Sequence, residues 1–206
     1  MLTLIGRELR DHVIYVVLAG FVSFVTVVTA ILAAAWGIVA AGPKLGAGMV
    51  VVLFLLFCVL GAAQMYTDRA NRISALLATS AVTRSRILAA RVLAGAAIIL
   101  AALVPLLITA VAILYFTDEP LVFYRGALAE VFTTAALASF ACYCVGLLFG
   151  WTANKAIPVL GVLFGTLLLV LLVVVKGLGL AAIVVLLLFS IAALLRVWYR
   201  FTSISL

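Results

Sequence analysis

Long apolar runs fill most of this chain and are separated only by short segments that carry charges, glycine or proline. These interruptions divide the chain into six runs, at residues 13–41, 47–66, 92–116, 127–149, 157–175 and 178–195. About 20 apolar residues cross a bilayer as one helix, so each run predicts one transmembrane span. The sequence therefore predicts an all-α membrane protein with six transmembrane helices, and residues 1–206 form a single transmembrane domain.

The last apolar region, residues 157–195, is interrupted only around Lys176-Gly177-Leu178-Gly179. A single helix over this region would be roughly 58 Å long. Since the hydrocarbon core of a bilayer is about 30 Å thick, tilting cannot absorb the excess. We expect the chain to turn back sharply at residues 176–179.

Charged residues make up only 9% of the chain, whereas 69% of the residues are hydrophobic. A soluble domain has about a quarter of its residues charged, so these values exclude an ordinary soluble domain. The net charge of +7 would suggest a nucleic-acid partner in a soluble protein. Here we expect no nucleic acid, because the charges mark the two sides of the membrane.

Six spans place both termini on one side of the membrane, and the basic residues fall mostly on that side. The opposite side receives only Lys44, Arg125 and Lys176. Cytoplasmic loops carry the excess of Lys and Arg, so both termini are expected in the cytoplasm. The basic residues on that side are Arg7, Arg10, Arg69, Arg72, Arg84, Arg86, Arg91, Lys155, Arg196 and Arg200.

The longest hydrophilic stretch, residues 67–86, follows the second span. Ile73, Leu76 and Leu77 recur there at i, i+3 and i+4 and share one face of a helix. We expect a short amphipathic helix, and then Thr83 as the N-cap of a helix that runs through Arg91 into the third span. The amphipathic helix either lies on phospholipid head groups or docks a soluble partner and transmits motion, and the spacing does not choose between these.

Three features together resemble the permease subunits of type-2 ABC exporters. They are the Arg-Glu-Leu-Arg-Asp segment at residues 7–11, the six runs, and the pattern Asp-Arg-x-x-Arg-Ile-x-x-Leu-Leu-x-x-Ser-x-Val-x-Arg-x-x-Ile from residue 68. The resemblance implies an interfacial helix at residues 1–12 and a coupling helix at 68–79, within a cytoplasmic loop at 67–91. It assigns ATPase coupling to Asp68, Arg69, Arg72, Ile73, Leu76, Leu77, Thr83, Arg84 and Arg86.

The same resemblance implies a separate ABC ATPase, which would bind ATP and magnesium, and a homodimer or heterodimer of membrane subunits in a bacterial or archaeal cell membrane. No Gly-x-x-x-x-Gly-Lys-Ser/Thr loop occurs in this sequence, so we expect no nucleotide or other cofactor in this chain. An apolar cavity between two subunits would suit an amphiphilic or lipid-like substrate. We expect no intrinsic catalytic site, because one His and scattered carboxylates do not form an acid/base or metal cluster.

Two alternatives remain open from the sequence. The chain also resembles, more distantly, the haem-exporter B subunit of cytochrome c maturation, which is similarly short and six-spanning. Its only histidine, His12, is expected at the cytoplasmic interface, which excludes haem ligation by a His within the spans. A non-transporting membrane anchor or assembly factor would share the hydropathy but would need no coupling helix.

Two polar residues within the spans are candidate cavity or helix-contact residues. Glu130 is expected about one turn into the fourth span, where a helix N-terminus favours an anion. A proton or cation site is the alternative. Gln64, near the cytoplasmic end of the second span, is expected to form a helix–helix hydrogen bond, or else to face a cavity.

The small residues within the spans are expected to serve packing. Cys58, Cys142 and Cys144 lie inside apolar runs, and the last two point to different helix faces, which disfavours a metal pair. The spacings Gly146-x-x-x-Gly150 and Gly161-x-x-x-Gly165 permit close approach of helices.

Overall fold

The structure is a computed structural model that describes residues 13–35, 42–70, 84–116, 121–150, 160–168 and 180–203, and every one of these residues is helical. The long helices are α2 (Val13–Ala35), α3 (Gly42–Ala70), α5 (Arg84–Phe116), α6 (Leu121–Gly150) and α8 (Leu180–Ser203). A short helix covers residues 160–168. The prediction of an all-α fold is confirmed for the described part of the chain.

Four of the described helices are long and apolar enough to cross a membrane. Their candidate spans are Val13–Leu32, Ser85–Ala112, Leu128–Gly150 and Leu180–Phe201, and α3 contains a shorter apolar stretch, Val50–Tyr66. The chain is therefore a multi-pass membrane protein.

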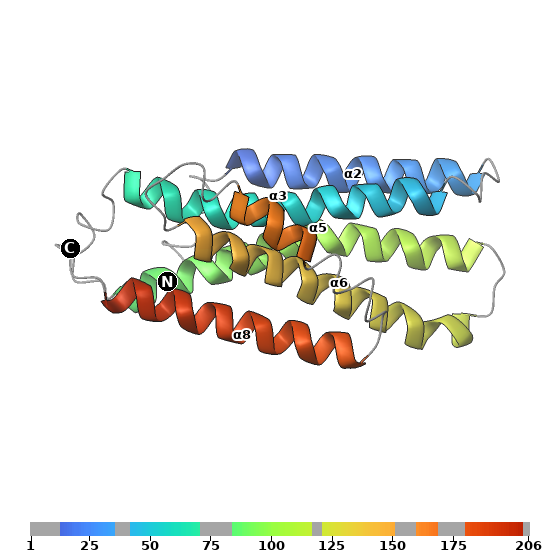
Figure 1. The fold of residues 1–206 in the computed structure, drawn as a ribbon. Helices are drawn as coiled ribbons and strands as arrows, with labels where there is room; N and C mark the ends of the chain where they lie inside the picture. Colours follow the sequence, from blue (N-terminus) through green and yellow to red (C-terminus); the bar gives the residue numbers. More distant parts are fainter. Residues whose placement is uncertain are drawn as a thin grey trace.

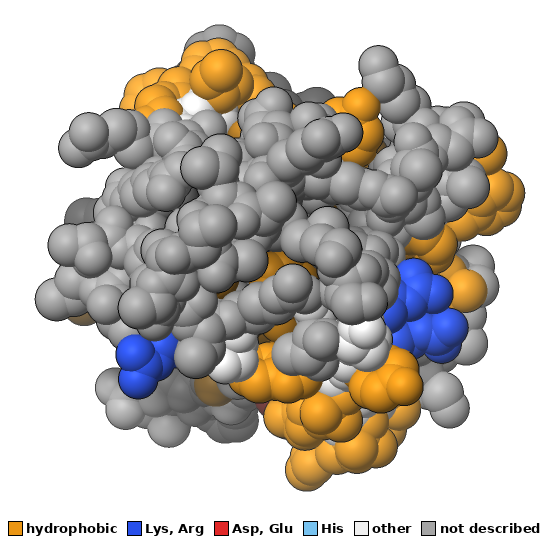
Figure 2. Space-filling view, turned by 90° about the vertical axis from the view of Figure 1, so that its left-hand side faces the viewer, with side chains coloured by type: hydrophobic (Ala, Val, Ile, Leu, Met, Phe, Trp, Pro, Cys, Tyr) orange, Lys and Arg blue, Asp and Glu red, His pale blue; other side chains and the backbone are white. Residues whose placement is uncertain are grey.

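The helices lie side by side in an elongated bundle (Figure 1). α2 and α5 run in one direction along the bundle, whereas α3, α6 and α8 run in the other (Figure 1). One end of the bundle, which we call the basic end, therefore holds the start of α5 and the C-terminal ends of α3, α6 and α8. Arg86, Arg196 and Arg200 belong to these helix ends, and Figure 2 views this end, with Lys and Arg side chains in blue. Lys44 lies in the first turn of α3 and Arg125 in the second turn of α6, at the opposite end.

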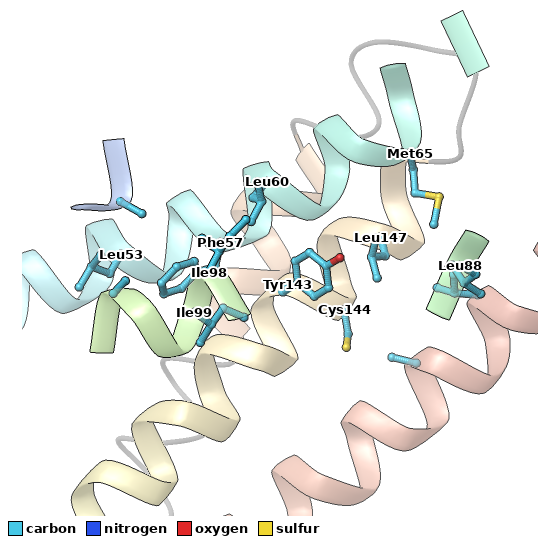
Figure 3. Packing of buried hydrophobic residues seen from close by; sticks show 14 of the residues in the cluster. Leu53, Phe57, Leu60, Met65, Leu88, Ile98, Ile99, Tyr143, Cys144 and Leu147 are labelled. Atoms are coloured by element: carbon cyan, nitrogen blue, oxygen red, sulfur yellow. The ribbon is translucent and has the colours of Figure 1, made fainter. Parts of the chain in front are cut away.

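The core is centred on α3 and α6, which form the most extensive helix–helix contact among the described helices. Phe57 and Leu60 of α3 pack with Ile98 and Ile99 of α5 and with Tyr143 of α6 in the larger of two buried clusters (Figure 3). α2 packs on α3 and α5 at one side of the bundle, and α8 packs on α6 at the other.

Two helix starts differ from the sequence prediction. α3 begins at Gly42, so the interruption at residues 42–46 between the first two apolar runs is helical. Pro43 is compatible with this because the first turn of a helix needs no N–H donor from that residue. α6 begins at Leu121, six residues before the fourth apolar run, because the apolar segment Leu121-Val122-Phe123-Tyr124 extends the helix.

The chain reverses direction between residue 168 and Leu180. Gly161 lies against Phe149 of α6 and Gly165 lies against Val145, so this short helix is antiparallel to α6. α8 is parallel to α6 (Figure 1), and Leu147 and Val197 lie around one small pocket near the ends of the two helices. The reversal falls in the interval that contains the predicted turn at 176–179, which itself lies outside the described residues.

Candidate functional site

A buried polar cluster joins α3, α5 and α6. The hydroxyl of Tyr143 on α6 lies 2.6 Å from Oε1 of Gln64 on α3 and 3.1 Å from the carbonyl oxygen of Arg91 on α5. Tyr143 is fully buried, and Gln64 and Arg91 are each only 2% exposed. Figure 3 shows the ring of Tyr143 among the core residues of α3 and α5. The cluster is therefore a buried polar junction of three helices.

Two glycines make room for the Tyr143 side chain. A Cβ on Gly95 of α5 would overlap the Tyr143 ring and would come within 2.6 Å of its hydroxyl oxygen. A Cβ on Gly61 of α3 would overlap the Tyr143 carbonyl oxygen. These two positions let α3 and α5 approach both the side chain and the backbone of Tyr143, which fixes the phenol between them.

Both contacts of the Tyr143 hydroxyl can be hydrogen bonds at once in only one orientation of the Gln64 amide. A tyrosine hydroxyl has one proton and cannot donate to two acceptors at once. Nε2 of Gln64 makes no hydrogen bond with the described residues. Half a turn of the amide would let Nε2 donate to the Tyr143 hydroxyl, which would leave the hydroxyl proton for the Arg91 carbonyl. Gln64 thus makes the interhelical hydrogen bond that its position in the span predicts.

The cluster lies one to two helical turns from the end of α3 and from the start of α5, the two helix ends that border residues 71–83. Gln64 is roughly 9 Å along α3 from its end at Ala70, and Arg91 is roughly 10 Å along α5 from its start at Arg84. Tyr143 lies roughly 10 Å from the end of α6 at Gly150. The two helices that flank residues 71–83 are therefore joined to each other through Tyr143.

The predicted coupling residues fall at and between these two helix ends. Asp68 and Arg69 form the last turn of α3, which continues to Ala70 rather than ending before the loop. Arg84 begins α5, directly after the predicted N-cap Thr83, and Arg86 is exposed in its first turn. The interfacial helix at 1–12 and the residues Arg72, Ile73, Leu76, Leu77 and Thr83 lie outside the described residues.

Glu130 does not cap a helix, contrary to the sequence prediction. Because α6 begins at Leu121, Glu130 is in its third turn, beyond the reach of the N-terminal dipole. The side chain is exposed, and its backbone carbonyl accepts a 2.7 Å hydrogen bond from the Thr134 hydroxyl. The position is polar but is built into no cluster among the described residues.

The predicted packing role of the small residues is confirmed. Cys142 lies in one buried cluster and Cys144 in the other, so the two thiols do point to different faces of α6. A Cβ on Gly146 would overlap the carbonyl oxygen of Cys58, and a Cβ on Gly150 would lie 2.5 Å from that of Ala62. α3 and α6 therefore contact each other backbone to backbone.

An apolar cavity of about 170 Å³ lies between the same three helices, toward the end opposite the basic end. It lies between the first half of α3, the second half of α5 and the first half of α6. Glu130 is on the far side of α6 from this cavity, since it is offset by roughly 150° from the lining residues of that helix. The lining side chains are Val50, Leu53, Phe54, Leu103, Leu106, Leu107, Ala110, Leu128, Val131, Phe132 and Ala135.

Sequence reasoning did not identify Tyr143 or the apolar cavity. Tyr143 counts as apolar in a hydropathy run, although a buried phenol needs a hydrogen-bond partner. Its neighbour Gly146 and the polar Gln64 were the available signals. The sequence marks Arg91 as a basic residue near the membrane side, but it does not indicate that its backbone carbonyl belongs to the junction.

Comparison with protein-family models, curated proteins and solved structures gave no significant match for this chain.

Proposed function

We propose that this chain is the transmembrane subunit of an ATP-driven exporter of the type-2 ABC class. It would work as a dimer with a separate ATPase and move an amphiphilic or lipid-like substrate by alternating access. The loop pattern from Asp68 to Ile87 and the multi-pass membrane character support this proposal. ATP and magnesium would bind to the ATPase partner.

The proposed topology adds two spans to the four long apolar helices. α3, with 29 residues, is roughly 43 Å long and exceeds the thickness of a hydrocarbon core, although its apolar stretch is short. The helix at 160–168 runs antiparallel to α6, as a fifth span would. In this topology the basic end is cytoplasmic, in agreement with the excess of Arg residues there.

The observation that carries the proposal is the position of the Tyr143 hydroxyl between Gln64 and the Arg91 carbonyl. A coupling element must pass a displacement of the cytoplasmic loop to the helices around it. Here the two helices that bracket residues 71–83 share one buried partner on α6. A displacement of the loop would therefore reach three helices rather than one. A simple membrane anchor needs no such connection.

Two charge substitutions, one on the apolar face of the predicted coupling helix and one outside it, test the proposal. We expect Leu76→Asp to abolish co-purification of the ATPase, because it places a carboxylate on the apolar face formed with Ile73 and Leu77. Ser74→Asp adds the same charge outside that face and should retain the ATPase. The measurement is the amount of ATPase, identified by its phosphate-binding loop, that remains with the affinity-purified membrane subunit.

Either of two results would refute the proposal. If no such ATPase accompanies the wild-type chain, the anchor interpretation holds. If the ATPase accompanies Leu76→Asp and wild type equally, the loop helix does not dock it and instead rests on lipid head groups.

A further inference from the structure

We propose that the apolar cavity between α3, α5 and α6 binds one hydrocarbon chain of a membrane lipid. The inference requires only that the chain is embedded in a bilayer. It does not depend on the proposed transport function, and its test contains no ATPase.

The chemistry of the lining selects the occupant. Every side chain that lines the cavity is apolar, from Val50 and Phe54 on α3 to Phe132 and Ala135 on α6. A buried water needs two to four polar partners, so water would be poorly held there. The volume of about 170 Å³ compares with the apolar cavity of about 150 Å³ that binds benzene. A hydrocarbon segment on the order of six carbons therefore fits.

The position of the cavity determines which hydrocarbon can reach it. Its α5 lining runs from Leu103 to Ala110, roughly 9 to 20 Å from the end of that helix at Phe116. This stretch belongs to the candidate span Ser85–Ala112, so the cavity lies at the depth of lipid acyl chains. Val50 and Val131 line the cavity and are also 36% and 43% exposed, so the cavity reaches the outer surface of the bundle. A lipid chain can enter there from the side.

Small side chains in the lining allow the cavity to be filled without adding a polar group. Ala135→Leu would add bulk inside the cavity. Ala129→Leu makes the same change six residues earlier on α6, at an exposed position that does not line the cavity. The two variants form a matched pair, because both are Ala-to-Leu changes within the same apolar helix.

Quenching of tryptophan by brominated lipid tests the proposal directly. The native Trp36, Trp151 and Trp198 are replaced by Phe, and one reporter is introduced, either Phe132→Trp in the cavity or Ile108→Trp on the exposed face of α5. The protein is placed in vesicles of phosphatidylcholine with bromine at mid-chain. We expect both reporters to be quenched. Ala135→Leu should reduce quenching at the cavity reporter at least twofold and should not change quenching at the α5 reporter. Ala129→Leu should not change quenching at either reporter.

The proposal is overturned if the cavity reporter is not quenched, or if its quenching is the same with and without Ala135→Leu. A second measurement needs no tryptophan change. Native mass spectrometry of the detergent-released chain should show about one fewer retained phospholipid for Ala135→Leu than for Ala129→Leu. Equal lipid retention in these two variants would also overturn the proposal.

Discussion

Gly146→Ala probes the backbone-to-backbone contact between α3 and α6. A methyl group at this position would overlap the backbone carbonyl oxygen of Cys58 and would lie 2.8 Å from the backbone nitrogen of Ala62. Backbone atoms cannot rotate away as a side chain can. To restore an ordinary separation of about 3.4 Å from that carbonyl oxygen, α3 and α6 must move apart by more than ~1 Å.

This separation has a cost because helices in lipid associate without a hydrophobic driving force. The association depends on van der Waals packing and interhelical hydrogen bonds. A gap of about 1 Å removes about half of each atom-pair attraction of about 0.1–0.2 kcal/mol. For on the order of 40 atom pairs across the contact, the loss is roughly 2 to 4 kcal/mol. Alanine regains up to about 1 kcal/mol of helix propensity, so we expect a net destabilisation of about 1 to 3 kcal/mol.

Gly20→Ala on α2 is the matched control. A Cβ at Gly20 meets nothing within 4 Å, so only the helix-propensity gain remains and the variant should be as stable as wild type or more stable. The measurement is equilibrium unfolding by SDS titration in mixed micelles, followed by circular dichroism. If Gly146→Ala unfolds at the same SDS fraction as wild type or at a higher one, the tight α3–α6 contact is refuted.

Two further predictions follow from the cluster and from the topology. Tyr143→Phe keeps the ring beside Gly95 but removes the hydroxyl that bonds to the other helices. The same assay should show that the free energy of unfolding falls by about 0.6 to 1.7 kcal/mol. An unchanged free energy of unfolding would mean that the hydroxyl contributes nothing to the junction. The native cysteines are fully buried, so they should not react with a membrane-impermeant maleimide. In the proposed topology this reagent should label Asp118→Cys in intact cells and Ser74→Cys only after permeabilisation. The reverse pattern would show that the topology is inverted.

The positions of the helices follow from the sequence more closely than their ends do. A run of apolar residues near span length specifies a helix because every backbone polar group must be satisfied within the bilayer. The start of α3 at Gly42 differs for another reason, because an interruption that contains Pro43 also fits a first helical turn. The start of α6 at Leu121 differs because the apolar residues 121–124 extend the helix. The error at Leu121 then produced the wrong capping role for Glu130, since that role depended on where α6 begins.

The candidate site was predictable only in part. Gln64 was found because an amide within a span must find a partner. Tyr143 does not stand out in the sequence because a hydropathy pattern counts it as an apolar residue. Such a pattern does not show that its hydroxyl needs a hydrogen-bond partner. The cavity could not be inferred from the periodicity of apolar residues. This periodicity indicates which face of a helix is buried, but it does not give the distance between the buried faces of two helices. That distance depends on where glycines allow contact, such as Gly146 against Cys58.

The glycine contact and the cavity both lie between α3 and α6, at different positions along the two helices. α3 and α6 run parallel, with Cys58 beside Gly146 and Ala62 beside Gly150, and the cavity lies between them farther toward the opposite end. Dispersion attraction weakens steeply with distance, so the backbone contact between α3 and α6 resists separation. A relative movement of the two helices that preserved this contact would be a rotation about it. Val50 lies roughly 12 Å along α3 from Cys58, so a pivot of about 5° shifts it by about 1 Å. A displacement of α3 that starts at the basic end therefore alters the width of the cavity more than it alters the contact.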